Sequence, residues 1–339
     1  MTSNRNAVVI DGKRIALDTT QLPADCWLLK DLAPLAPLKC LEEAVLVGRI
    51  ISDLTPLADL KQLTKLYLSQ NWIADIAPLA NLTKLKRLEL DENQITDLSP
   101  LADLEQLNVL CLNKNQVADL APLASLKQLT VLNLCENPVS DLSPLAALTR
   151  LRDLRLSNTQ ASDLSPLADM TKLHDLYLSS AQITDLTPLA GLTQLTSLDL
   201  SHNRISDLSP LAGLQNLQTL SLAHNQITAL SPLARLPNLR VLCLQQNQIE
   251  DLAPLAELPQ LDTVVLDDNQ ITNLEGLNGA RIGSLSLQRN PISDITPLVG
   301  IPRLRELYVR NCPVKRKSLA IFRKAHPDCY IERQNCTEG

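Results

Sequence analysis

Aromatic residues are scarce in this chain of 339 residues: phenylalanine, tryptophan and tyrosine together make up 2% of it, with a single phenylalanine. Hydrophobic residues still reach 45%, so a core has to be built from leucine and isoleucine. No run of about 18 uninterrupted apolar residues occurs, and no apolar run of signal-peptide length follows residues 1–7. We therefore expect a cytoplasmic protein without membrane contact. Secretion as an effector without a cleaved signal is the alternative.

Excess positive charge is also lacking. The net charge is −6 and the isoelectric point lies near 5.3, which argues against nucleic acid as a partner. Glycine occurs only nine times, and the sequence contains neither a glycine-rich phosphate loop nor a catalytic serine motif. These absences predict a protein that is not an enzyme and that needs no cofactor.

What the sequence does contain is a repeat of 22 residues, seen clearly in ISDLSPLAGLQNLQTLSLAHNQ at residues 205–226. Thirteen copies follow one another, and all have 22 residues except residues 271–291, which have 21. We number the positions of each copy from its first residue. The copies begin at Leu29, Ile51, Ile73, Ile95, Val117, Val139, Ala161, Ile183, Ile205, Ile227, Ile249, Ile271 and Ile292.

Seven positions of the repeat are apolar, and their spacing predicts two kinds of local structure. The alternation in Thr219 to Ala223 indicates a short strand with two leucines facing inward and three side chains facing outward. The other apolar positions are three residues apart, which suits a tight helical turn. In Ser209-Pro210 we expect the serine to be the N-cap and the proline the first helical residue.

Asparagine recurs at position 21, directly beside the buried leucines. An amide side chain offers donors and an acceptor to the loop backbones on either side, so the sequence predicts an internal asparagine ladder with a structural role. Nine copies carry it: Asn71, Asn93, Asn115, Asn137, Asn203, Asn225, Asn247, Asn269 and Asn290. Thr159 and Ala181 interrupt the ladder, which indicates either sequence drift compensated by a water molecule or a local change of curvature.

The pattern L-x-x-L-x-L-x-x-N, extended as I-x-D-L-S-P-L-A-x-L-x-x-L-x-x-L-x-L-x-x-N-x, resembles the leucine-rich repeats of the bacterial internalins over residues 29–313. This resemblance implies an α/β solenoid, a right-handed curved superhelix. It implies a parallel sheet on the concave face, short 3-10 or helical turns on the convex face, and protein recognition on the concave side. An internalin export signal and helical cap are not evident in the sequence, and this is a departure from the family.

Both ends of the repeat array need caps, because an exposed leucine edge would otherwise face water. Residues 1–28 form the first cap, where two apolar runs flank Asp11-Gly12 and predict a β-hairpin. Residues 314–339 form the second, a short helix that packs Leu319, Ile321 and Phe322, followed by a strand near Tyr330. The 21-residue copy has lost its proline and gained glycines, so we expect the highest mobility of the array near residues 275–284.

Eight cysteines do not form a disulfide framework in this pattern, because most lie in distant copies of the repeat. A reducing compartment is the simpler interpretation. Cys312 stands at the ladder position. It could approach Cys329 and Cys336 at the carboxyl end, so a disulfide there stays open.

Function has to lie at positions 15, 17, 19 and 20, which the fold leaves free. All three tyrosines of the array occupy position 17, and tyrosine is an enriched anchor of protein interfaces. The adjacent charges are mostly acidic, which favours a partner with a basic patch. The predicted site on the concave face comprises Tyr67, Glu89, Asp91, Arg155, Tyr177, Asp199, His202 and Tyr308.

Three interpretations of function follow. The first is a bacterial protein-interaction module, expected to be a monomer, that binds a protein partner on its concave face without catalysis. The second is an effector that is delivered into another cell and binds a host protein there. The third is a metal or enzymatic site at His202 and His224, which share position 20 in adjacent copies.

Overall fold

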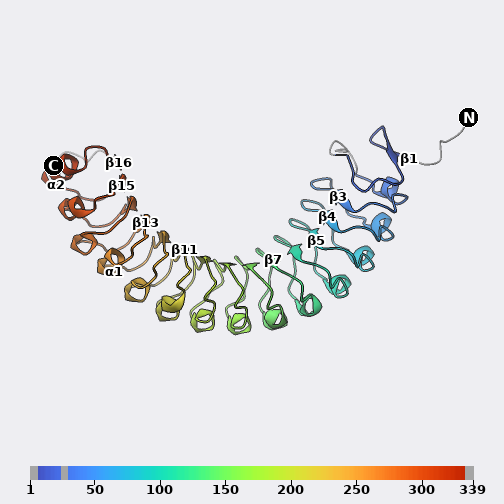
Figure 1. Cartoon of the computed structure of the whole chain (residues 1–339), viewed down its shortest axis with the longest axis horizontal. Helices are drawn as coiled ribbons and strands as arrows, with labels where there is room; N and C mark the ends of the chain where they lie inside the picture. Colours follow the sequence, from blue (N-terminus) through green and yellow to red (C-terminus); the bar gives the residue numbers. More distant parts are fainter. Residues whose placement is uncertain (1–6, 24–29, 333–339) are drawn as a thin grey trace, which may run out of the picture. The chain divides into compact units, whose positions relative to one another are not determined.

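The computed structural model describes residues 7–23 and 30–332. The chain forms two compact units, Met1–Leu173 and His174–Gly339. In each unit the short strands form a parallel sheet in chain order on the inner side, and the helical turns lie on the outer side (Figure 1). This is the architecture of a leucine-rich repeat solenoid, as the sequence predicts.

The first unit contains an antiparallel hairpin and six parallel strands. The hairpin pairs β1 (Ala7–Ile10) with β2 (Lys13–Ala16), and Asp11 and Gly12 form its turn, both with positive φ. The parallel strands are β3 (Glu43–Val45), β4 (Lys65–Tyr67), β5 (Arg87–Glu89), β6 (Val109–Cys111), β7 (Val131–Asn133) and β8 (Asp153–Arg155). The 3-10 turns are η1 (Ala33–Leu35), η2 (Thr55–Leu57), η3 (Ala77–Leu79), η4 (Ser99–Leu101), η5 (Ala121–Ser125), η6 (Ser143–Ala147) and η7 (Ser165–Leu167).

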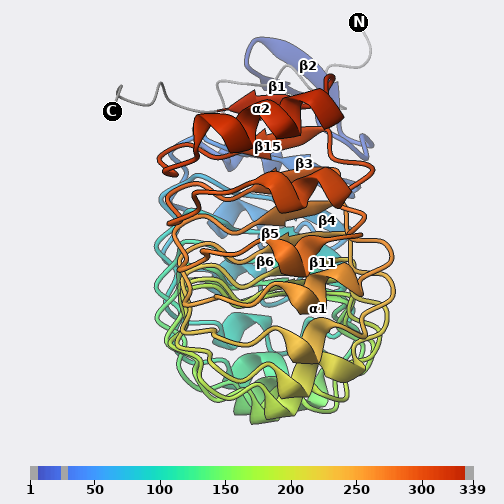
Figure 2. The same ribbon diagram turned by 90° about the vertical axis from the view of Figure 1, so that its left-hand side faces the viewer.

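The second unit continues the same pattern with eight parallel strands. They are β9 (Asp175–Tyr177), β10 (Ser197–Asp199), β11 (Thr219–Ser221), β12 (Val241–Cys243), β13 (Thr263–Val265), β14 (Ser284–Ser286), β15 (Glu306–Tyr308) and β16 (Tyr330–Glu332). The turns are η8 (Thr187–Leu189), η9 (Ser209–Gly213), η10 (Ser231–Leu233), α1 (Ala253–Ala256), η11 (Glu275–Leu277) and η12 (Thr296–Gly300). Helix α2 (Arg316–Ala325) lies over the end of this unit beside β15 (Figure 2).

The core consists of stacked aliphatic side chains, and the predicted inward positions are confirmed. Parallel pairing without register shift places Leu198 beside Leu220 and Leu220 beside Leu242. Each fully buried leucine contributes about 1.5–3 kcal/mol of transfer free energy, which explains how short strands are held together. In the copy at residues 205–226 all seven apolar positions are at most 1% exposed: Ile205, Leu208, Leu211, Leu214, Leu217, Leu220 and Leu222.

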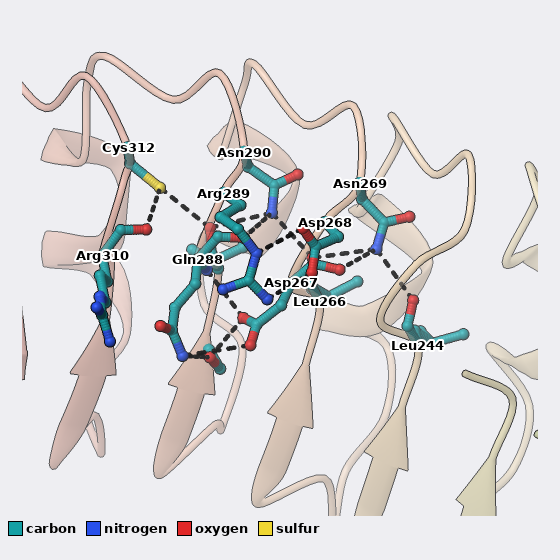
Figure 3. A network of polar contacts seen from close by, with 12 residues as sticks. Leu244, Leu266, Asp267, Asp268, Asn269, Gln288, Arg289, Asn290, Arg310 and Cys312 are labelled. Carbon is teal, nitrogen blue, oxygen red and sulfur yellow. Dashed lines mark hydrogen bonds and ion pairs between the residues drawn. The ribbon is translucent and has the colours of Figure 1, made fainter. Parts of the chain in front are cut away.

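The asparagine ladder is confirmed, and its geometry is repetitive. Asn225 accepts a hydrogen bond from the Ile205 N–H (3.0 Å) and donates to the carbonyls of Leu200 and Leu222 (both 3.0 Å). Figure 3 shows the end of the ladder, where Cys312 takes over the position and its thiol donates to the Leu287 carbonyl at 3.1 Å. Thr159 fills its ladder position by donating its hydroxyl to Leu156 O at 2.7 Å. The change of curvature stays a prediction.

The predicted serine N-cap is wrong. The capping residue of η9 by backbone conformation is Leu208, and the acceptor for the Ser209 N–H is the Asp207 carboxylate at 2.8 Å. Aspartate two residues before the amide closes a tight Asx turn, which a serine at position five cannot do for its own N–H. Hydrogen bonds from the Ser209 side chain and backbone lower the pKa of Asp207. The strand is also shorter than predicted, since β11 ends at Ser221.

The carboxyl-terminal cap contains the expected helix and strand, with one error in its packing. Leu319 is 6% and Phe322 is 0% exposed, but Ile321 is 44% exposed. Residues 319 and 322 lie on one helical face, whereas residue 321 projects about 100° away from residue 322. The Ser318 hydroxyl accepts the Ile295 N–H at 2.6 Å and helps to fix α2 on the array. The mobility of residues 275–284 and the three-part division of the chain stay predictions.

Candidate partner-binding surfaces

The inner face of each unit is made of three rows of side chains, from positions 15, 17 and 19. In-register parallel pairing places equal positions of adjacent copies side by side, as Val45 beside Tyr67 and Tyr67 beside Glu89. Neighbouring strands are about 4.8 Å apart, so a row presents closely spaced side chains that one partner can contact together.

The first unit presents apolar side chains at its amino-terminal end. Val45 is 50% and Val47 is 40% exposed, and the half-buried ring of Tyr67 follows. The Arg87 Cζ atom lies 5.7 Å from the centre of the Tyr67 ring, a cation–π contact. A hollow of about 360 Å³ adjoins this end and is lined by Gln21, Leu22, Pro23, Glu43, Val45, Val47 and Arg49. Of these side chains, only Tyr67 was among the predicted site residues.

Most predicted charges of the first unit are already paired. Arg87 bonds Glu89 (Nη2 to Oε1, 2.6 Å), and this hydrogen bond raises the pKa of Arg87. Arg155 forms a fork with Asp153 at 3.0 and 2.8 Å. The rows at positions 15, 17 and 19 carry four carboxylates (Glu43, Glu89, Asp91 and Asp153) and three cations (Lys65, Arg87 and Arg155), so their net charge is −1.

Asp91 links the two neighbouring copies of the repeat through hydrogen bonds to its carboxylate. Its Oδ1 accepts the Asn113 N–H at 2.8 Å, and its Oδ2 accepts the Ser69 hydroxyl at 3.3 Å. Burial raises the pKa of this carboxyl despite the hydrogen bonds. Nearby, burial and the charges of Asp91 and Glu89 raise the pKa of the Cys111 thiol to about 12, so this cysteine is a poor nucleophile.

The second unit has a more acidic inner face. Positions 15, 17 and 19 carry four carboxylates (Asp175, Asp199, Asp267 and Glu306) and one cation, Arg310, which gives a net charge of −3. Asp199 accepts the Ser201 N–H at 3.0 Å, and Tyr177 lies beside it in the pairing of β9 with β10. Asp267 accepts hydrogen bonds from the Ser286 hydroxyl and from the Gln288 N–H, and Figure 3 shows Asp267 beside Gln288.

An aromatic pair ends the inner face of the second unit. The rings of Tyr308 and Tyr330 meet edge to face, with 6.0 Å between their centres, and Tyr330 is 58% exposed. Desolvation, followed by the charge of Glu306, raises the pKa of Tyr308. Of the predicted site residues, Tyr67, Glu89, Asp91 and Arg155 therefore lie in the first unit and the other four in the second.

His202 and His224 are stacked, with 3.9 Å between their ring centres and 18° between their planes. Both have positive φ (56° and 55°), because position 20 adopts the left-handed conformation in every 22-residue copy. In residues 7–23 and 30–332 no group of three or more histidine, cysteine, aspartate or glutamate side chains could hold a metal ion. The two imidazole rings make an aromatic contact at the edge of the sheet.

We predict that the His202→Ala substitution raises the pKa of His224. Burial, and then the positive charge of His202, lower this pKa from 6.5, so the substitution restores only part of the shift. An unfolded chain binds the proton more tightly, so the contribution of His224 to stability falls as the pH drops from 6.5 toward the folded pKa. NMR titration of the His224 ring measures the effect. An unchanged His224 midpoint in the variant would contradict the coupling.

Two large apolar side chains outside the inner rows, Trp72 and Ile50, are also exposed, at 61% and 49%, and were not predicted. Both occupy position 22 in adjacent copies, where the other copies carry glutamine, arginine or proline. That difference in residue type could have identified them from the sequence.

Cys312 and Cys329 are free thiols, and Cys336 lies outside the described residues. No helix in the described part of the chain is long and apolar enough to cross a membrane.

The chain has the architecture of a leucine-rich repeat scaffold: short parallel strands, a leucine core, an asparagine ladder and rows of exposed side chains on an inner face. The family model of leucine-rich repeats in two copies matches residues 61–103, 105–147, 127–169, 149–191, 193–235 and 237–279. An internalin of Listeria monocytogenes, inlF, is 37% identical and superposes with a TM-score of 0.82, covering 87% of this chain and 89% of that chain. The chain belongs to the leucine-rich repeat family and has internalin-type repeats. Members are generally non-catalytic binding modules.

Two further structures share the fold. A leucine-rich repeat protein of Leptospira interrogans is 22% identical with a TM-score of 0.74, covering 93% of each chain. The plant peptide hormone receptor RGFR1 in complex with RGF2 is 20% identical with a TM-score of 0.64, covering 86% of this chain and 55% of that chain. No curated protein sequence matches the chain at a significant level.

Proposed function

We propose that this protein binds a protein partner through the inner faces of its repeats and catalyses no reaction. The observation that carries the proposal is the apolar end of the first unit, where Val45 and Val47 are exposed and the half-buried Tyr67 lies beside Val45. Exposed aliphatic and aromatic groups in a row are costly in water and form interface anchors when a partner covers them.

The two inner faces favour different contacts. In the first unit the ion pairs of Arg87 and Arg155 neutralise their neighbours, so apolar and aromatic contact dominates there. In the second unit the net charge of −3 favours a basic patch on the partner. Complementary charge raises the association rate more than the affinity, and it is screened by salt.

The free thiols support a further part of the proposal, that the protein acts in a reducing compartment. Cys40 is exposed, and Cys111, Cys135 and Cys243 are partly exposed on the inner faces. Exposed thiols persist where glutathione and thioredoxin keep them reduced.

The test uses the full chain to capture a partner, identifies it by mass spectrometry, and then measures its affinity for purified variants. We expect Tyr67→Ala to weaken binding by roughly 30-fold, the loss typical of a hot-spot residue of about 2 kcal/mol. The Asp199→Asn, Glu306→Gln variant should slow association at low salt and change dissociation little.

Trp72→Ala is the matched control, because Trp72 is an exposed aromatic residue outside the inner face. The proposal fails if Trp72→Ala weakens binding while Tyr67→Ala and the Asp199, Glu306 variant leave both affinity and association rate unchanged. Circular dichroism of each variant verifies that the fold is retained.

A further inference from the structure

A second hollow, of about 380 Å³, lies in the second unit at the edge of the sheet where the strands begin. It is lined by Arg240, Val241, Pro259, Gln260, Leu261, Asp262, Thr263, Arg281 and Arg303. Three of these nine residues are arginines, although the chain as a whole carries a net charge of −6. The volume is within the range of about 300–1,000 Å³ that is typical of small-ligand sites.

The repeat positions bring these residues together. Arg240, Asp262, Gly283 and Arg305 precede four successive strands, β12 to β15, and backbone hydrogen bonds link them in series. The Asp262 N–H donates to Arg240 O at 2.9 Å, the Gly283 N–H to Asp262 O at 2.8 Å, and the Arg305 N–H to Gly283 O at 2.8 Å. These backbone hydrogen bonds fix the spacing of the four residues.

Gly283 makes the arrangement possible. The Arg305 guanidinium reaches across it to Asp262, with Nη2 at 3.1 Å from both carboxylate oxygens, although the two residues are 43 positions apart. A Cβ atom at residue 283 would overlap the Asp262 carboxylate and the Arg305 guanidinium. The single carboxylate in the lining is therefore already paired with an arginine outside it.

The three lining arginines, by contrast, have no acidic partner among the described residues. Arg240, Arg281 and Arg303 form no ion pair there, and all three are exposed. Three guanidinium groups around one hollow repel one another, and an anion with more than one charge relieves this repulsion. Guanidinium groups also match the oxygen geometry of phosphate, to which they donate in pairs.

We propose that this hollow binds a phosphoryl group in its dianionic form. The dianion balances more of the three positive charges than a carboxylate does. A free phosphate and a phosphorylated serine side chain present the same group, so both can supply it. The hollow borders the position-15 row of the second unit through Val241 and Thr263, whereas its three arginines lie outside the inner rows. The phosphoryl site does not depend on the protein partner proposed above.

The experiment titrates the full chain with inorganic phosphate by isothermal calorimetry or NMR at constant ionic strength. We expect saturable binding at pH 7.5, where phosphate is mainly a dianion. Binding should weaken at least fivefold at pH 5.5, because the phosphate dianion takes up a proton near pH 6–7 and becomes a monoanion. The variant with Arg281→Gln and Arg303→Gln should weaken binding at least tenfold, and Arg240→Gln should weaken it too. Arg303→Lys should bind phosphate more tightly than Arg303→Gln, because the positive charge remains. It should bind less tightly than the native chain, because the planar guanidinium is lost.

Arg204→Gln is the matched control, since Arg204 is an exposed arginine of the same unit away from the hollow. A second arm uses a phosphoserine peptide and its unphosphorylated counterpart, and distinguishes a side-chain source from free phosphate. The proposal is overturned if neither phosphate nor the phosphopeptide binds. It is also overturned if the double variant binds as tightly as the Arg204→Gln control. Because the substituted residues are exposed, unfolding midpoints of all variants should agree with that of the native chain.

Discussion

Replacing Asn225 with alanine is expected to lower the free energy of unfolding by about 3 kcal/mol, because a buried N–H loses its acceptor and a cavity forms. The group left without an acceptor is the Ile205 N–H, which lies 3.0 Å from the Asn225 Oδ1. The carbonyls are less affected. Leu200 O still accepts from Asn203, and Leu222 O still accepts from Asn247, both at 2.9 Å.

The matched control is Gln226→Ala, which removes an exposed amide side chain at the next residue. It should change the free energy of unfolding by less than about 0.5 kcal/mol. Urea denaturation followed by circular dichroism measures both variants. Equal midpoints for Asn225→Ala and Gln226→Ala would show that the ladder is not a source of stability.

Replacing Phe322 with alanine is expected to lower the free energy of unfolding by about 3–5 kcal/mol, the range for removing a fully buried aromatic ring. Phe322 is the only phenylalanine of the chain, is 0% exposed and stacks on His326 with 4.8 Å between ring centres. Because α2 covers the end of the second unit, the loss should be local (Figure 2). We expect the amides of β15 and η12 to exchange hydrogen much faster, while those of β10 and β11 change little.

Ile321→Ala is the control for this experiment. Ile321 is the adjacent aliphatic residue and is 44% exposed, so its truncation should cost less than about 1 kcal/mol. A loss of stability in Ile321→Ala as large as in Phe322→Ala would contradict the packing of α2. It would indicate that the helix buries a different face in solution.

Periodic features could be predicted from the sequence because each is repeated many times. Seven buried positions, the strand, the outer turn and the ladder occur in copy after copy, so a single exception does not hide the rule. The capping assignment failed because Asp207 and Ser209 are both typical of helix starts. Only the distance between Asp207 Oδ1 and the Ser209 N–H distinguishes them.

Features that depend on side-chain direction or on single exceptions were harder to predict. Ile321 was placed in the core because it is apolar and adjacent to Phe322, although on a helix residue 321 points about 200° away from residue 319. The arginine hollow requires knowing that Arg305 reaches over Gly283. The identity of the inner-face residues is visible in the sequence, but their pairing, as in Arg155 with Asp153, is not.

We propose that the framework positions of the repeat specify the fold, while the exposed rows specify the partner. The most direct test is a single-residue substitution scan of the full chain with two readouts, folded yield and binding of the captured partner. We predict that substitutions at Tyr67 and its row neighbours reduce binding without reducing folded yield, and that substitutions at Asn225 and Leu220 reduce both. Loss of binding at well-folded variants of the outer turns, with the inner rows tolerant, would contradict the claim.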